Sequence, residues 1–285
     1  MKIFKKIITC ALVGVILAMA TFSLTACEDL RTLEINVSVV NVSDGTPTDY
    51  TLTVKLYRHL APKTVDAIVS YASEGYYDGV AIYKDIDTSA IMVGDFNFDG
   101  KNVTRKDEKP TVKGEFNNNG VTGSDLLNDE GYVGLWRNYS DYTVSEPSRD
   151  SGRATIFMPT TSKTAYNGYF CVFGKFDVSD ENNQSAWSAI KNVFDSASYS
   201  ETYVIYYTGE YNNDDTVKDN GLTFHCVTSD EFDSLPQSEK DNVFTPDVEE
   251  GQYKNYAKRS VKLPVFGNNK NDRICGAYVK NVKVK

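Results

Sequence analysis

The chain has 285 residues, with 30 basic and 39 acidic side chains and a formal net charge of −9 at pH 7. An apolar fraction of 41% and a charged fraction of 24% predict a packed core rather than wholesale disorder. The acidic balance excludes the class of nucleic-acid binders, which need a basic face. Two histidines and five scattered cysteines leave little material for a zinc site. We therefore expect neither a metal nor, from the acidic balance, a nucleic acid as partner.

The first 27 residues have the pattern of a secretory signal. Three lysines precede an apolar run from Ile7 to about Phe22, which is too short for a permanent membrane span. The run ends in Leu24-Thr25-Ala26-Cys27, which resembles the lipobox of bacterial lipoproteins, where the cysteine sulfur receives a diacylglycerol. The alternative is an ordinary signal peptide with a chance cysteine.

This pattern divides the chain into a signal peptide (1–27), a short tether (28–32) and a folded domain (33–285). Acyl chains on Cys27 would hold the protein on a membrane surface, because two anchoring signals suffice for stable attachment. No later stretch approaches the length of a transmembrane helix. We therefore expect an extracytoplasmic protein, lipid-anchored to the bacterial cell membrane through Cys27.

The folded part contains many short strand-like segments, of which 33–40, 51–57 and 276–284 alternate apolar and polar residues. In chain order these are 33–40, 51–57, 80–84, 90–94, 131–136, 154–159, 170–176, 202–207, 222–227 and 276–284, the last with a slip in its alternation at Asn281. The segment 97–109 is polar and predicts a loop.

Two segments have helical spacing instead. Pro62 opens a helix that Gly75 ends, since proline suits the first turn and glycine the position after the last. Residues 185–194 place apolar side chains at the same spacing, and 229–235 predicts a short helix capped by Ser229. Many strands with few helices predict a mainly β protein, a barrel or a sandwich with helical caps.

Three cysteines remain for the folded domain, so at most one internal disulfide can form. Cys171 lies in an apolar run and is predicted to be a buried thiol. Cys226 and Cys275 are the better candidates for a pair, but spacing alone leaves open that all three are free.

Six segments occur in an order that generic β proteins do not share. They are LTVKLYRHLAPKTVDAIVSYASEGYYDG (52–79), KGEFNNNG (113–120), GYVGLWR (131–137), DSGRATIFM (150–158), YNGYFCVFGKF (166–176) and NNKNDRICGAYVKNVKVK (268–285). In this order they resemble the cyclophilin-type peptidyl-prolyl cis-trans isomerases. The resemblance implies a closed antiparallel eight-stranded β-barrel capped by two helices, with an insertion at about 198–262 before the last strand.

The activity implied by the resemblance is rotation about X-Pro bonds, the one peptide bond with an appreciable cis population. Amide resonance gives a barrier of about 18–20 kcal/mol. An enzyme lowers it by favouring the twisted amide, with a donor aimed at the pyramidal prolyl nitrogen and a pocket for the ring. No cofactor is required, so none is expected.

The resemblance also assigns site residues. Lys84 stands where the family has its catalytic arginine, and Phe157 matches the pocket phenylalanine. Lysine keeps the charge but loses the planar guanidinium, so this exchange is not conservative. The matched substrate-binding positions are Ala90, Met92, Thr155, Trp136, Ala165, Tyr166 and Phe170. At these positions the family has other residue types. Ala90 stands in place of a methionine, and Met92 and Thr155 stand in place of two glutamines. Ala165 replaces a tryptophan, Phe170 replaces a histidine, and Trp136 replaces a small residue.

The leading function is therefore a peptidyl-prolyl isomerase of weakened activity that assists the folding of proline-containing polypeptides after export. Because most site positions have changed, the alternative is a cyclophilin-fold lipoprotein that binds peptides without turnover. A third interpretation is a surface lipoprotein whose insertion carries the interaction.

Overall fold

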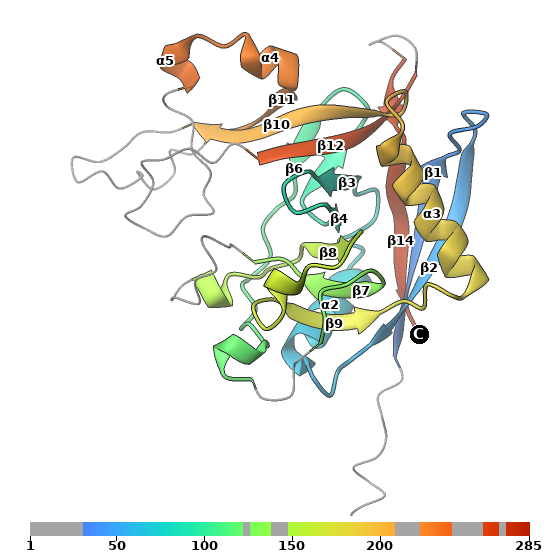
Figure 1. Cartoon of the computed structure of the whole chain (residues 1–285), viewed down its shortest axis with the longest axis vertical. Coiled ribbons are helices and arrows are strands. Elements are labelled where there is room, and N and C mark those ends of the chain that lie inside the picture. Colours follow the sequence, from blue (N-terminus) through green and yellow to red (C-terminus); the bar gives the residue numbers. More distant parts are fainter. Residues whose placement is uncertain (1–30, 122–125, 138–147, 209–222, 241–258, 268–271) are drawn as a thin grey trace, which may run out of the picture.

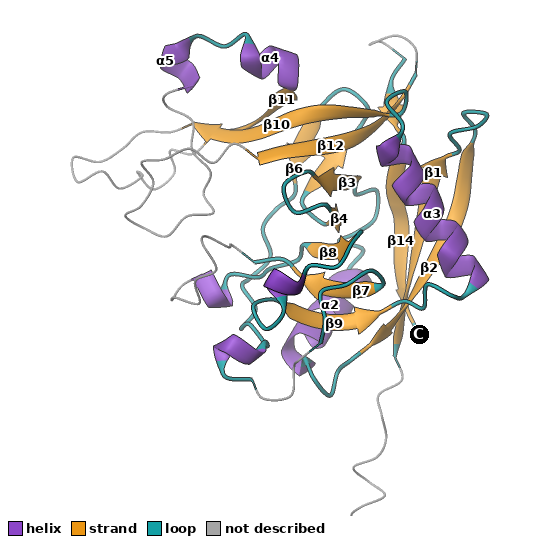
Figure 2. Ribbon diagram, viewed as in Figure 1, coloured by secondary structure: helices purple, strands orange, loops and turns teal. Residues whose placement is uncertain are grey.

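A hairpin of two long strands, β1 (Thr32–Val40) and β2 (Pro47–Leu56), begins the described part of the chain (Figure 1). The structure is a computed structural model that describes residues 31–121, 126–137, 148–208, 223–240, 259–267 and 272–285. Strands dominate these segments, and the helices lie beside them (Figure 2). The predicted mainly β class is therefore confirmed.

Most strands belong to one sheet, whose hydrogen-bonded order is β11-β10-β12-β3-β4-β8-β7-β9-β2-β1-β14. Their remaining bounds are β3 (Ile82–Asp85), β4 (Ala90–Val93), β7 (Tyr132–Leu135), β8 (Ile156–Pro159), β9 (Cys171–Lys175), β10 (Ser200–Thr208), β11 (Thr223–Thr228), β12 (Arg259–Phe266) and β14 (Ala277–Val284), with β13 (Ile274–Cys275) paired to β12. Among the described residues this order has two ends, so strand pairing does not establish the predicted closure into an eight-stranded barrel.

Two long helices flank this sheet, as predicted. Helix α2 (Pro62–Ser73) begins with the proline, and α3 (Glu181–Asp195) begins four residues before the apolar pattern because the Asp180 side chain caps it by accepting from the Asn183 amide. Helix α3 lies along β1 and β2 (Figure 1). Shorter helices are α4 (Ser229–Asp233), α5 (Gln237–Lys240) and the 3₁₀ turns η1 (Asn117–Asn119), η2 (Ser148–Asp150) and η3 (Thr164–Tyr166). No helix among the described residues is long and apolar enough to cross a bilayer.

The slip predicted in the last strand is a β-bulge. Opposite it, the pairing of β1 with β14 moves from Asn36↔Asn281 to Val37↔Val279, so Lys280 is the extra residue. The Asn36 amide donates to the Asn281 side chain over 2.8 Å and thereby fixes the register there.

Three predictions about local structure were wrong. The N-cap of α4 is Thr228 and not Ser229, because the Thr228 hydroxyl accepts from the Glu231 amide. The segment predicted as a loop at 97–109 contains a two-stranded ribbon, β5 (Phe96–Phe98) and β6 (Val103–Arg105). The Phe96 and Phe98 side chains are buried, and Asn97 between them is exposed. This is the alternation of a strand, but three residues are too few to predict a strand from the sequence. The sequence prediction also missed β12, because its apolar alternation follows a polar segment and contains Pro264.

The strands β3, β4 and β8 separate two apolar cores. Ile82, Ile91 and Ile156 point into the first core with α2 and α3. Their neighbours Tyr83, Met92 and Phe157 point to the opposite face, into a second core with side chains of β10 and β12. This second core is where the predicted substrate-binding residues and the predicted insertion meet.

All three cysteines of the described domain are free thiols. Cys171 is fully buried, and its thiol contacts the Thr64 hydroxyl at 3.2 Å. Burial raises the pKa of each of the three thiols to about 12. The predicted Cys226–Cys275 pair does not form a disulfide in this structure.

Candidate functional site

An aromatic cluster surrounds Phe157 at the centre of β8. Gly134 of β7 lies opposite it, and a Cβ there would come within 2.3 Å of the Phe157 ring. Glycine therefore lets the ring lie across the neighbouring strand. Trp136 packs edge-on against Phe157 and stacks on Phe170, with ring centroids 5.7 Å and 5.1 Å apart.

This cluster is covered rather than open. Phe157 is 0% exposed and Phe170 is 2% exposed. Tyr203 and Ile205 of β10 and Leu263 of β12 belong to the same buried core, so the last strands of the sheet close over the face that carries Phe157. The matched pocket residue thus has no free apolar surface to offer a proline ring directly.

Arg259, the first residue of β12, brings a guanidinium to the edge of this cluster. Its Nε donates to the Asp85 carboxylate, and its Nη2 lies 3.3 Å from the Tyr83 hydroxyl and 2.7 Å from the Met92 sulfur. The guanidinium carbon also lies 5.5 Å from the centre of the Trp136 ring, within the range of a cation–π contact. A cationic donor therefore lies directly beside the aromatic cluster.

Asp95 lies beside the same cluster and accepts hydrogen bonds from two hydroxyl groups. The Tyr83 hydroxyl and the Thr155 hydroxyl both donate to its carboxylate. Burial raises the pKa of Tyr83 well above its ordinary value, so this phenol stays protonated and remains a donor. Gly94 precedes Asp95 with φ +121°, and a Cβ at Gly94 would lie 2.8 Å from the Ala154 carbonyl. The glycine therefore permits the close approach of the loop to β8.

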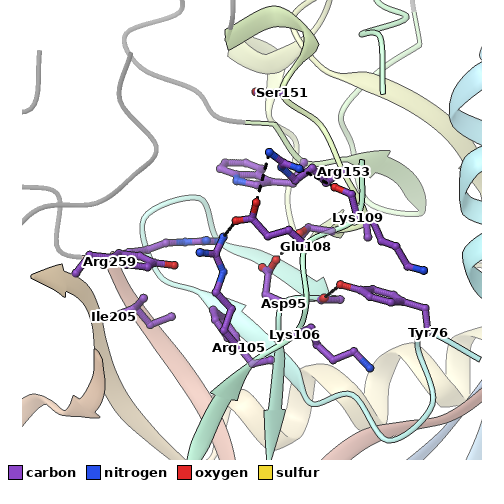
Figure 3. A pocket seen from close by; sticks show the side chains of 16 residues that line it. Tyr76, Asp95, Arg105, Lys106, Glu108, Lys109, Ser151, Arg153, Ile205 and Arg259 are labelled. Carbon is purple, nitrogen blue, oxygen red and sulfur yellow. Dashed lines mark hydrogen bonds and ion pairs between the residues drawn. The ribbon is translucent and has the colours of Figure 1, made fainter. Parts of the chain in front are cut away.

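These groups line a cavity of about 370 Å³ (Figure 3). Trp136, Thr155, Asp95 and Arg259 form part of its wall, together with Ile205 of β10. Arg105, Lys106, Glu108, Lys109 and Arg153 add a rim of charge at the other side. The cavity therefore combines an aromatic face, a guanidinium and hydroxyl groups, which is a set that can hold a peptide by its ring and carbonyl groups.

Lys84 is not at this cavity. Side chains alternate along β3, so Tyr83 and not Lys84 faces Met92 and Phe157. The Lys84 ammonium lies 3.1 Å from the Asp195 carboxylate at the end of α3, in a separate cavity lined by α3 residues. The structure does not bring Lys84 and Phe157 to one groove, and a catalytic role for Lys84 stays a prediction.

Other predicted positions do come together. Met92 and Ala90 are buried with Phe157 and Phe170, while Thr155 and Trp136 reach the cavity. The Tyr166 ring packs on Phe170 at 4.9 Å between centroids, and Ala165 beside it is exposed. Cys27 lies outside the described residues.

Two site residues were missed by sequence reasoning. Arg259 lies in a segment with no motif, and it contacts Asp85 across 174 positions, which no local pattern reveals. Asp95 was not among the predicted site residues. The described residues contain no cluster of three or more histidines, cysteines or carboxylates that could hold a metal ion.

Comparison with known proteins identifies a family for this chain. The family model described as "Cyclophilin type peptidyl-prolyl cis-trans isomerase/CLD" matches residues 40–203. Over 44 residues the chain is 43% identical to a protein of Staphylococcus aureus (strain USA300) named "Putative peptidyl-prolyl cis-trans isomerase", and to one of the same name from Staphylococcus haemolyticus (strain JCSC1435). The aligned segment spans 15% of this chain and 22% of either relative.

Among solved structures, a cyclophilin-type isomerase of Cryptosporidium parvum, studied in the presence of the dipeptide Ala-Pro, aligns with 68% of this chain and 98% of its own. The sequence identity is 15% and the TM-score 0.36. The family match extends over more than half of the chain and includes Tyr83, Asp95, Trp136 and Phe157. The chain therefore belongs to the family of cyclophilin-type peptidyl-prolyl cis-trans isomerases.

Proposed function

We propose that this protein is a peptidyl-prolyl cis-trans isomerase that acts on proline-containing polypeptides, with its reaction centre at the cavity beside Trp136. The observation that carries the proposal is the position of the Arg259 guanidinium, which lies against Met92 and over Trp136. Met92 is a substrate-binding position where the resemblance puts a glutamine. An arginine supplied by β12 thus lies beside it, in place of the arginine that the family supplies from the segment of Lys84.

The chemistry needs only positioned dipoles and charge. A guanidinium aimed at the prolyl nitrogen stabilises the pyramidal amide of the transition state more than the planar ground state, which lowers the rotation barrier. Its ion pair with Asp85 restricts its orientation, because the Asp85 side chain is 3% exposed and held by strand pairing. Trp136 lines the cavity and offers the proline ring an apolar contact.

The family's barrel is part of this proposal. Eight consecutive strands from β3 to β14 follow one another in the sheet, and an isolated bridge joins Ala81, just before β3, to Tyr278 of β14. This bridge supports a barrel seam at that point, with β10, β11 and β12 attached outside it. On this interpretation the predicted insertion at 198–262 extends the sheet over the face that carries Phe157.

The location is proposed from the N-terminal pattern. An extracytoplasmic, lipid-anchored isomerase would meet exported polypeptides while they fold, so its role is assistance of folding after export. Residues 1–30, including Cys27, lie outside the described part of the chain.

A second candidate function has one specific observation in its favour. Phe157 is fully buried beneath Trp136 and Phe170, so the ring pocket expected from the resemblance is filled by the protein itself. A binding module that holds peptides at the neighbouring cavity without turnover would be built in this way.

One experiment separates the two candidates. The full chain in mild detergent is added to a peptide with a single Ala-Pro bond, and cis-trans exchange is followed by NMR without a protease. Isomerisation faster than the uncatalysed rate supports the enzyme. Shift changes that saturate while the exchange rate stays at the uncatalysed value support the binding module. If the peptide shows neither faster exchange nor shift changes, both candidates are contradicted.

A further inference from the structure

The cavity beside Trp136 has a charge opposite to that of the whole chain. Five basic side chains line it against two carboxylates, Asp95 and Glu108, whereas the chain carries a net charge of −9. Two of the five pair with carboxylates outside the lining, Lys109 with Glu74 and Arg259 with Asp85, so the lining keeps a small basic excess. The basic residues are Arg105, Lys106, Lys109, Arg153 and Arg259. A concave, positive site on an acidic protein attracts anionic groups.

Glu108 shows what the rim of this cavity binds. Its carboxylate lies between two guanidinium groups (Figure 3): Arg105 donates to one oxygen, and Arg153 Nη2 lies 3.4 Å from the other. Arg153 is also held by donating to the Lys109 carbonyl over 2.7 Å. Two guanidinium groups from different segments therefore already form a site for one carboxylate, and planar guanidinium pairs are suited to that ligand.

The Glu108 side chain is not locked into this position. It is 45% exposed and lies in the segment after β6, where no helix or strand holds the backbone. The Arg105 and Arg153 side chains are 36% and 41% exposed. An exposed ion pair of this kind contributes little net stability, so an incoming carboxylate can replace Glu108 at small cost.

We propose that the rim formed by Arg105 and Arg153 binds an acidic side chain of the polypeptide substrate, and that Glu108 occupies this site in the free protein. The preferred substrate class is thus a proline-containing segment with aspartate or glutamate near the proline. The inference rests on the proposed function only for placing a polypeptide in this cavity.

Binding of labelled peptides to the full chain in mild detergent tests the proposal by fluorescence anisotropy. The peptides share one length and one proline and differ in a neighbouring Glu, Gln or Lys, and a fourth peptide keeps Glu but has Ala for Pro. We expect the Glu peptide to bind about fivefold more tightly than the Gln peptide at low salt, with the Lys peptide weakest. The preference should shrink at high salt, because these groups are partly exposed and are screened.

Variants identify the residues. Arg105→Gln and Arg153→Gln should each reduce the Glu-over-Gln preference to about twofold or less, whereas Glu108→Gln should strengthen Glu-peptide binding about threefold and leave the Gln peptide unchanged. Arg58→Gln and Asp66→Asn are the matched controls, because they make the same charge changes in an exposed ion pair that does not line this cavity. Both controls should retain the preference.

Each outcome decides one proposal or both. Equal affinity for the Glu and Gln peptides would overturn the acidic-substrate inference and leave the isomerase proposal standing. A preference for Glu over Gln, together with equal affinity for the Glu peptides that carry Pro and Ala and no acceleration of exchange, would support the carboxylate site and count against the isomerase. No binding of any peptide would overturn both, and an unchanged affinity in Glu108→Gln would overturn the role of Glu108.

Discussion

Arg259 and Asp85 form an ion pair between the first residue of β12 and the last residue of β3, two strands joined across 174 positions of sequence. The Asp85 side chain is 3% exposed and that of Arg259 is 18% exposed. The same carboxylate accepts from the Thr88 amide over 2.8 Å, so Asp85 also fixes the turn that follows β3. One buried carboxylate therefore joins the outer strands to the proposed reaction centre.

Removal of one partner from this pair should be costly. Asp85→Ala leaves the guanidinium without its buried counter-charge, so we expect the free energy of unfolding to fall by about 3 kcal/mol, measured in urea. Asp66→Ala in the exposed pair with Arg58 is the control and should change it by about 1 kcal/mol or less. Similar losses in the two variants would contradict the structural role of Asp85.

Elements with long patterns could be predicted from the sequence, and contacts across the chain could not. The alternation of 33–40 and the helical spacing after Pro62 correspond to β1 and α2, because local propensity and one-sided burial agree there. The family resemblance identified the position of Lys84, but a position in an alignment does not state which face of a strand a side chain takes. Arg259 lies at the site because β12 pairs with β3, which is distant in sequence, and no motif around Arg259 predicts this.

The free thiols give a further test. Burial raises the pKa of Cys226 and Cys275 to about 12, so both stay protonated and should react slowly with iodoacetamide at pH 8 in the folded protein. Mass spectrometry after denaturation in the presence of the reagent should then find all three domain cysteines alkylated without prior reduction. A Cys226–Cys275 disulfide in the unreduced protein would contradict the structure.

Acid should weaken the contact between α3 and the loop before β7. The Lys191 ammonium, 2.6 Å away, holds the pKa of Glu130 below its usual range, and the Trp187 indole also donates to this carboxylate. As pH falls from about 4.5, the unfolded state takes up the proton first, so this stabilisation is complete above that pH and is lost as pH falls through the folded pKa.

Urea unfolding at pH 6 and pH 3.5, followed by tryptophan fluorescence, tests this dependence. The loss of stability on acidification should be smaller in Glu130→Gln than in the unmodified protein. Glu34→Gln serves as a control of equal charge change, since Glu34 lies on β1 in a longer pair with Lys285, 3.6 Å apart, and it should preserve the full loss. An identical loss in Glu130→Gln and the unmodified protein would count against the assignment.

Anchoring depends on Cys27 if the N-terminal pattern is a lipobox. Cys27→Ser removes the sulfur that would receive the lipid, so the expected result is an unprocessed or soluble protein in cell fractionation. Ser23→Ala, which changes a nearby residue and keeps the cysteine, should still fractionate with the membrane. Membrane association of Cys27→Ser equal to that of the unmodified protein, with a processed N-terminus, would refute lipid attachment at Cys27.

The most direct test of the reaction centre compares Arg259 and Lys84 by their effects on NMR-detected exchange of an Ala-Pro peptide. Loss of a preorganised donor costs about 2.7–4 kcal/mol, so Arg259→Gln should lower kcat/KM by about a hundredfold or more. A double variant that also carries Asp85→Asn avoids a buried unpaired carboxylate. Circular dichroism would check that this double variant is folded. Lys84→Ala should stay within about twofold of the unmodified protein, because its ammonium lies with Asp195 away from the cavity. A large loss in Lys84→Ala with full activity in the Arg259 variants would contradict this account.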